Sequence, residues 1–200
     1  MDTLQAINAR RAVKHYDPDF AMPQEDVDTL LNLAIQSPTS FNIQNWRFVL
    51  VQDKAQRAKV REAAWGQAQV TDASLLFVMC ADLKSWQKQP ERYWKNAPQA
   101  AQDMLLPMIG PFYDDKETLQ RDEAMRSIGI AAQTMMLAAK SMGYDSCPMI
   151  GFDPTQVAQI INLPEDHVVG MLLVVGKATK PAWPKPGQLP LTEVMVTDRF

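Results

Sequence analysis

Residues 74–81 of this 200-residue chain read SLLFVMCA, an almost unbroken apolar run bounded by polar residues. Such a run is typical of a β-strand that is covered on both faces, because a half-exposed strand alternates apolar and polar residues. Residues 168–176 (VVGMLLVVG) form a second strong run, and residues 47–52 (RFVLVQ) form a further strand. The sequence therefore predicts one sheet at the centre of the protein.

Helical segments alternate with these strands. Residues 24–36 follow Pro23, carry acidic side chains in the first turns and repeat apolar side chains at helical spacing. Other helices are expected over residues 3–14, 54–64 and 116–142. Because helix and strand signals are mixed throughout, we predict an α+β fold in one domain spanning residues 1–200.

The middle of the longest predicted helix, residues 128–139 (IGIAAQTMMLAA), is apolar on almost every side. A helix of this kind is buried all round. In so short a chain this indicates either a homodimer whose interface covers one face of the helix or a central core helix within a single chain. The preceding region, residues 82–111, is expected to hold helical pieces that break at Pro90, Pro98 and Pro107.

The C-terminal arm, residues 178–200, is expected to run extended. It carries prolines at positions 181, 184, 186 and 190, which exclude a helix or an inner strand there. Residues 193–197 are predicted as a short strand at the tip of the arm. An arm of this kind could reach over a second copy and add an edge strand to that copy's sheet.

Composition excludes several functions. The net charge of −3 is not that of a nucleic-acid-binding protein, and no apolar run approaches the roughly 20 residues of a membrane helix. The N-terminus shows no secretory signal, and Cys80 and Cys147 are expected to be buried thiols of a cytoplasmic protein. His15 and His167 lie far apart in sequence, so no metal site is predicted. No dinucleotide-binding glycine motif, phosphate-binding loop or nucleophile elbow is present.

Two polar stretches indicate a binding site. Residues 10–14 (RRAVK) offer three cations, and residues 37–47 (SPTSFNIQNWR) offer hydroxyl and amide groups beside two aromatic rings. If the first helix continues far enough, Arg10 and Lys14 lie on one of its faces. Cations bind phosphate, and uncharged hydroxyl and amide groups bind polar ring edges. These stretches are therefore the expected walls of a site for a flat, polar molecule that carries a phosphate.

In order and separation, residues 10–16 (RRAVKHY), residues 37–47, residues 148–153 (PMIGFD) and the proline-rich arm resemble the FMN-dependent nitroreductase family, in its small bacterial NAD(P)H nitroreductase branch. The resemblance covers nearly the whole chain. It implies a central, mostly antiparallel sheet flanked by helices, in an intertwined homodimer whose C-terminal arm is exchanged onto the partner's sheet. It also implies two FMN sites at the dimer interface, with NADH or NADPH as electron donor.

The resemblance also implies roles for individual positions. The cofactor-binding residues that it implies are Arg10, Arg11, Ala12, Lys14, Pro38, Thr39, Ser40, Asn42, Gln44, Gln67, Gln69, Pro148, Met149, Ile150, Gly151, Lys185 and Gln188. Candidates for an aromatic substrate pocket over the flavin are Phe41, Trp94, Phe112 and Tyr113. No side chain is assigned as catalytic, because FMN carries the redox chemistry.

Some positions depart from the family pattern. Ala12 stands where serine is frequent, Ile150 where some members carry glutamate, and Gln188 where a second basic residue is common. Gln67 and Gln69 are expected near the pyrimidine edge of the flavin. Because a neutral amide stabilises a reduced anion less than lysine would, we expect a comparatively low flavin potential.

The predicted function is that of an FMN-dependent NAD(P)H oxidoreductase. Hydride would pass through flavin N5 to a nitroaromatic, a quinone or a similar small acceptor, with ping-pong kinetics. Three alternatives remain open: a flavin enzyme of the same scaffold that acts on another substrate by dehalogenation or desaturation, an FMN-binding storage or sensor protein with little turnover, and a dimeric interaction protein whose cations bind a different phosphate.

Overall fold

The computed structural model describes every residue of the chain, 1–200. Its sheet has the strand order β1-β2-β4-β3, and each neighbouring pair is antiparallel. The strands are β1 (Trp46–Leu50), β2 (Leu75–Asp82), β3 (Asp145–Met149) and β4 (His167–Gly176). The three predicted strands are confirmed, with ends that differ by one or two residues, and so is the antiparallel sheet flanked by helices.

The sequence does not predict β3. Its residues read DSCPM, in which polar side chains and Pro148 hide the pattern of a strand. β3 lies at one edge of the sheet, and a proline is tolerated there because only one side of an edge strand needs a full ladder of hydrogen bonds.

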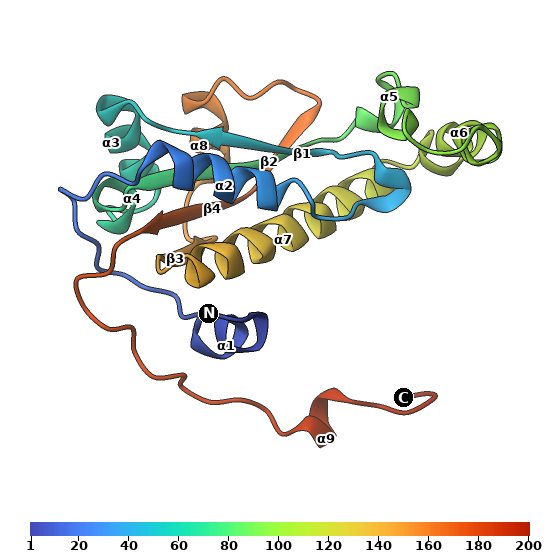
Figure 1. The fold of residues 1–200 in the computed structure, drawn as a ribbon. Helices are drawn as coiled ribbons and strands as arrows, with labels where there is room; N and C mark the ends of the chain where they lie inside the picture. Colours follow the sequence, from blue (N-terminus) through green and yellow to red (C-terminus); the bar gives the residue numbers. More distant parts are fainter.

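The helices cover the sheet on both faces and extend beyond one end of it (Figure 1). They are α1 (Thr3–Ala9), α2 (Gln24–Ala34), α3 (Lys54–Ala63), α4 (Gln69–Asp72), α5 (Glu91–Trp94), α6 (Gln99–Tyr113), α7 (Glu117–Ser141), α8 (Pro154–Ile160) and α9 (Leu191–Val194). Two short 3-10 turns, η1 (Ser40–Asn42) and η2 (Ser85–Gln87), precede β1 and α5. None of the helices combines the length and the apolar character that crossing a membrane requires.

Both faces of β2 are buried. Phe77 and Met79 point into the core that contains α2 and α7, while Leu76 and Val78 point into the core that contains α3, α4 and α8. All four side chains are fully buried. This two-sided burial is the reason why the strand is apolar at almost every position.

Helix α7 is not buried on every side. Ala131 and Met135 lie in the core beneath the sheet, but Ile130 is 43% exposed and Gln133 is exposed as well. The alternative that this helix is a core helix enclosed within a single chain is therefore wrong. The chain leaves one face of α7 uncovered. Gly143, with φ of +87°, follows the end of the helix in the left-handed conformation that favours glycine.

The first helix is shorter than predicted. A capping box between Asp2 and Gln5 starts α1, and the helix ends at Ala9 instead of continuing to Lys14. The chain then runs extended, because the backbone N–H of Val13 donates to the carbonyl of Ser146 at 3.1 Å and buries the Val13 side chain against β3. The expectation that Arg10 and Lys14 share a helical face is wrong.

Of the three breaks predicted before α7, those at Pro90 and Pro98 are confirmed, because Pro90 precedes α5 and Pro98 precedes α6. Pro107 and Pro111, however, both lie inside α6. Both are on its exposed side, where water can bind the carbonyl groups that a proline leaves without a donor. The prediction of a break at Pro107 is therefore wrong.

The C-terminal arm runs extended through its prolines and passes beside α1, away from the sheet (Figure 1). The predicted strand over residues 193–197 is wrong, because Leu191–Val194 forms the short helix α9 after Pro190. A strand requires a partner edge, and none adjoins the arm tip in a single chain, so a local turn forms instead.

Candidate functional site

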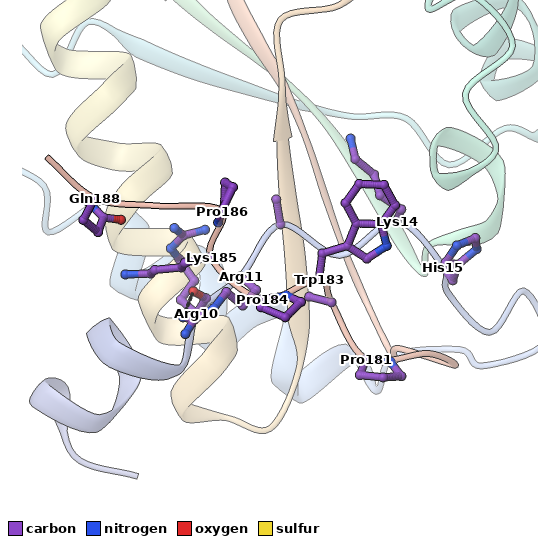
Figure 2. A pocket seen from close by; sticks show the side chains of 12 residues that line it. Arg10, Arg11, Lys14, His15, Pro181, Trp183, Pro184, Lys185, Pro186 and Gln188 are labelled. Carbon is purple, nitrogen blue, oxygen red and sulfur yellow. Dashed lines mark hydrogen bonds between the residues drawn. The ribbon is translucent and has the colours of Figure 1, made fainter.

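A cavity of about 430 Å³ lies between the extended N-terminal segment and the C-terminal arm (Figure 2). Its lining residues are Arg10, Arg11, Ala12, Lys14, His15, Pro181, Ala182, Trp183, Pro184, Lys185, Pro186 and Gln188. Four of them are cations of lysine or arginine, and none is a carboxylate. The cavity therefore favours an anion.

The extended backbone sorts the side chains of this segment. Arg10, Ala12 and Lys14 alternate with Arg11 and the buried Val13, as the two-residue period of extended chain requires. The guanidinium of Arg11 donates from Nη1 to the carbonyls of Asn8 (2.6 Å) and Arg10 (2.8 Å), at the end of α1. Arg11 is thus partly engaged by its own backbone.

Arg10, Lys14 and Lys185 form no ion pair with a carboxylate of the chain. Figure 2 shows Arg10 and Lys185 gathered beside Arg11, with Lys14 farther along, next to Trp183. Arg10, Arg11 and Lys185 are therefore brought together, Lys14 lines the same cavity farther along, and no ion pair within the chain neutralises Arg10, Lys14 or Lys185.

The end of β3 adjoins this cavity. Burial raises the pKa of the Cys147 thiol, while the nearby charges of Lys14 and Arg10 act in the opposite direction, so both cations lie close to β3. β3 leads directly into residues 148–151, which are predicted to contact the flavin. The backbone thus joins the cationic cavity to this loop.

Two amides hold that loop in place. Gln67 donates from Nε2 to the carbonyls of Ala64 (3.1 Å) and Gly151 (2.8 Å), which uses both of its N–H groups. Gln69, which is buried, donates from Nε2 to Oε1 of Gln67 at 3.0 Å and keeps one N–H free. Of the two predicted amides, Gln67 therefore positions the loop, and Gln69 keeps one N–H without a partner within the chain.

Gly151 is closely approached by an aromatic ring that sequence reasoning missed. A Cβ atom at Gly151 would lie 3.1 Å from the ring of Trp65, which is tighter than almost all such contacts. Trp65 is 73% exposed and has φ of +56°. Ile150, beside Gly151, is 81% exposed.

The sequence also did not indicate His15 and Trp183, which line the cationic cavity, because nothing in their sequence spacing marks them.

The second polar stretch forms a strained turn. Phe41, Asn42 and Gln44 have φ of 48°, 51° and 43°, in the left-handed region that favours glycine. The Oγ1 of Thr39 accepts a hydrogen bond from the backbone N–H of Gln44 at 2.9 Å, and Asn42 donates from Nδ2 to the carbonyl of Tyr93 at 2.8 Å. The hydroxyl of Thr39 therefore holds the backbone of the turn, and the amide of Asn42 ties the turn to α5.

The four predicted pocket aromatics lie together beside this turn. The ring centroid of Phe41 is 5.2 Å from that of Phe112 and 6.1 Å from that of Tyr113. Trp94 donates from Nε1 to the carbonyl of Phe41 at 2.9 Å. Tyr113 is fully buried and supports Phe41 from below, whereas Phe112 is 41% exposed. Phe41, Trp94 and Phe112 therefore supply the accessible aromatic surface.

The predicted site residues fall into two groups that a single chain does not bring together. The β3 group comprises the cationic cavity, Gln67, Gln69 and the 148–151 loop. The turn group comprises residues 38–44 and the aromatic residues of α5 and α6. Figure 1 shows them at opposite ends of the sheet, with β3 and α4 at one end and α5 and α6 at the other.

Comparison with known sequences connects this arrangement to a family. A model of the nitroreductase family matches residues 7–177. Protein DrgA of Synechocystis sp. is 50% identical over 200 residues, which cover 98% of this chain and 95% of DrgA. The Bacillus subtilis protein named "Putative NAD(P)H nitroreductase YodC" is 33% identical, over 96% of this chain and 97% of its own length.

Solved structures share the fold. A Staphylococcus epidermidis structure described as a "putative NAD(P)H:FMN oxidoreductase" has a TM-score of 0.91 at 28% identity, and the match covers 98% of this chain and 95% of that one. An Exiguobacterium sibiricum structure described as a "putative nitroreductase in complex with FMN" has a TM-score of 0.90 at 27% identity, covering 98% and 97%.

Proposed function

The chain belongs to the nitroreductase family, and on this basis we propose that it is an FMN-dependent NAD(P)H oxidoreductase. The observation that carries the proposal is the cationic cavity, which is joined through β3 to a glycine loop and to the free amide donor of Gln69. A related chain of the same fold is described as bound to FMN. Both kinds of contact that FMN requires, for a phosphate and for a polar ring edge, lie within reach of one strand.

The residues of the β3 group fit FMN. Arg10, Lys14 and Lys185 have uncompensated charge, and a phosphate dianion would neutralise it. Gln69 offers its remaining N–H to the pyrimidine edge of the ring. At Gly151 the absence of a Cβ lets the ring of Trp65 lie close to the backbone of the 148–151 loop.

The chemistry that FMN would supply in this site is the transfer of electrons from NADH or NADPH to a second substrate, such as a nitroaromatic or a quinone. The chain's own residues bind and orient: the cations hold the phosphate, and Gln67 holds the 148–151 loop. Phe41, Trp94 and Phe112 offer an apolar surface on which a flat acceptor can stack. No side chain is assigned to proton transfer.

The proposed assembly is a homodimer in the cytoplasm, in which the turn group of one copy completes the β3 group of the other. Three features support it. The two groups lie too far apart to meet in one chain (Figure 1). Ile130 of α7 and Leu4 and Ile7 of α1 are exposed apolar side chains. β1 pairs only with β2, so its outer edge is free for the arm of a partner.

An absorbance spectrum of the purified protein with added FMN tests the proposal, followed by anaerobic addition of NADH or NADPH. A perturbed flavin band that bleaches rapidly is the expected result. If no flavin binds, the proposal is wrong. If flavin binds but never bleaches, the protein holds FMN as a store or sensor instead. Sedimentation of the FMN-loaded protein as a single-chain species would contradict the homodimer.

A further inference from the structure

A second cationic site lies at the other end of the molecule. An open groove of about 590 Å³ runs between the start of β1 and α5, and it is lined by Gln44, Trp46, Arg47, Arg92, Tyr93 and Lys95. Three of these six residues are cations, and none is a carboxylate, although acidic residues outnumber basic ones by 23 to 20 in the chain as a whole. A local excess of positive charge on a net negative protein indicates a site for an anion.

Two of the cations are not neutralised within the chain. Lys95 makes no side-chain hydrogen bond and no ion pair, and Arg92 donates only to the neutral hydroxyl of Tyr93, at 2.5 Å. Glu91, the carboxylate of α5, pairs with neither of them. Both charges are therefore available to a ligand at the mouth of the groove.

Contacts of Arg47, and the stacking of Arg92 on Tyr93, fix the shape of the groove. Arg47 donates from Nη1 to the carbonyls of Gln44 (2.7 Å) and Trp46 (2.9 Å), and from Nη2 to the buried carboxylate of Asp82 at 3.3 Å. The guanidinium of Arg92 lies 4.7 Å from the centroid of the Tyr93 ring. A stacked guanidinium is already ordered, so it loses little further freedom when an anion binds.

The position of the groove points to its ligand. It starts at Gln44, which belongs to the turn group proposed to lie against the flavin, and it leads away from that turn toward α5. A dinucleotide whose nicotinamide ring stacks on the flavin must carry its phosphates outward along the protein surface. The cavity at Arg10 and Lys14 already accounts for the phosphate of FMN, so a second set of cations calls for a second phosphate-bearing molecule.

We propose that this groove binds the adenosine 2′-phosphate end of the hydride donor, so that NADPH is preferred over NADH. The inference rests on the proposed function, because it places the donor against the flavin. The two uncompensated cations, Arg92 and Lys95, match the two negative charges by which the 2′-phosphate distinguishes NADPH from NADH. Tyr93, which lies between them in the sequence, lines the same groove and offers an aromatic surface beside the site.

Titration calorimetry of the FMN-loaded protein with 2′,5′-ADP and with 5′-AMP tests the groove directly. We expect 2′,5′-ADP to bind about tenfold more tightly than 5′-AMP, and the double variant Arg92→Gln/Lys95→Gln to lose this difference. In steady-state kinetics the same variant should raise the KM for NADPH about tenfold, with kcat and the KM for NADH changed less than about twofold.

The matched control is Lys54→Gln/Lys59→Gln on α3, which removes the same charge from exposed positions away from the groove. It should leave both titrations unchanged. Equal affinities for 2′,5′-ADP and 5′-AMP in the unaltered protein, or unaltered discrimination in the groove variant, would overturn the proposal.

The test of the groove can fail without the proposed oxidoreductase function failing, and the two failures give different results. Absence of FMN binding would defeat the oxidoreductase proposal. Normal flavin binding and bleaching by NADH, combined with no discrimination between the two adenosine phosphates, would defeat the groove alone. Unaltered FMN affinity in the groove variant confirms that the variant is folded.

Discussion

The two ends of the sheet hold the two groups of predicted site residues, and they are built in different ways. At the β3 end, Arg10 and Lys14 come from an extended segment bound to the edge of β3, and no carboxylate neutralises either cation. At the α5–α6 end, Thr39 and Asn42 use their side chains to hold a left-handed turn. The β3 end leaves these two cations free, whereas the turn at the other end already uses these two side chains.

This difference indicates a division of labour. Free charges contribute to binding only when a ligand arrives, so the β3 end should govern affinity for the phosphate of FMN. A turn that is held by its own hydrogen bonds contributes shape, so the α5–α6 end should govern which acceptor fits. Substitutions at each end should therefore change different quantities.

The largest effect is expected from Arg10→Gln/Lys14→Gln. Loss of two charge-assisted contacts should raise the dissociation constant of FMN about 100-fold, as measured by fluorescence titration. Riboflavin, which lacks the phosphate, should bind the variant and the unaltered protein equally.

Arg11→Gln serves as the control for this pair. Because Nη1 of Arg11 donates to the backbone carbonyls of Asn8 and Arg10, its loss should change FMN affinity by less than about threefold. An equal loss of riboflavin affinity in the double variant would show that the two cations act on the fold and not on the phosphate.

At the other end, Phe41→Ala should separate acceptor binding from cofactor binding. Removal of the ring that packs on Phe112 should raise the KM for a nitroaromatic acceptor about tenfold and leave FMN affinity within about threefold. Phe20→Ala, which removes a half-buried ring that pairs with Tyr144, controls for lost stability. A parallel loss of FMN affinity in Phe41→Ala would contradict the division.

The sequence predicts the buried strands well, because burial on both faces leaves a nearly continuous apolar run in β2 and in the buried second half of β4, residues 172–176. It predicts less well where long-range contacts override local preference. Residues 10–14 have the composition of a helix, but they are extended because Ala12 pairs with Ser146 of β3. β3 itself, with Pro148 at a sheet edge, has no local signature.

The candidate site shows the same contrast. The cations of residues 10–14 and the polar turn are visible in the sequence because their residue types are unusual for their position. Trp65 and Trp183 are not, because only the folded chain brings them to Gly151 and to the cationic cavity. The sequence also does not reveal that both side-chain N–H groups of Gln67 donate to backbone carbonyls, while Gln69 keeps one side-chain N–H without a partner.

Because Gln69 keeps one N–H without a partner, a substitution at this position should change the potential of bound FMN, and this effect should be smaller than those above. Gln69→Lys should raise the two-electron potential of bound FMN by about 30 mV, because a cation near the pyrimidine edge stabilises the reduced flavin by about 1.4 kcal/mol more. Spectroelectrochemical titration measures it. Gln36→Lys, an exposed substitution of the same charge outside both groups, should leave the potential unchanged. An equal rise in both variants would show an effect of net charge alone.

The smallest effect concerns how α5 and α6 are attached to the sheet. Lys88, just before α5, donates from Nζ to Asp166 at 2.6 Å and to Asp82 at 2.9 Å. The hydrogen bond from Lys88 holds the pKa of Asp166 below its ordinary value of 3.8. Because the pKa is lower in the folded chain than in the unfolded one, this contact stabilises the fold above about pH 4 and is lost as pH falls through the folded pKa.

Asp166→Asn should therefore lose less stability than the unaltered protein between about pH 5 and about pH 2, in chemical unfolding at each pH. Since Asp166 is partly exposed, the difference should be at most about 1 kcal/mol. Lys88→Met should flatten the acid limb in part, because it removes the larger of the two contacts that lower the pKa of Asp166, the other being the hydrogen bond with His167. If Lys88→Met instead leaves the acid limb unchanged, the attachment of α5 and α6 depends on the apolar cluster of Ile43, Trp86 and Tyr113 and not on this charge.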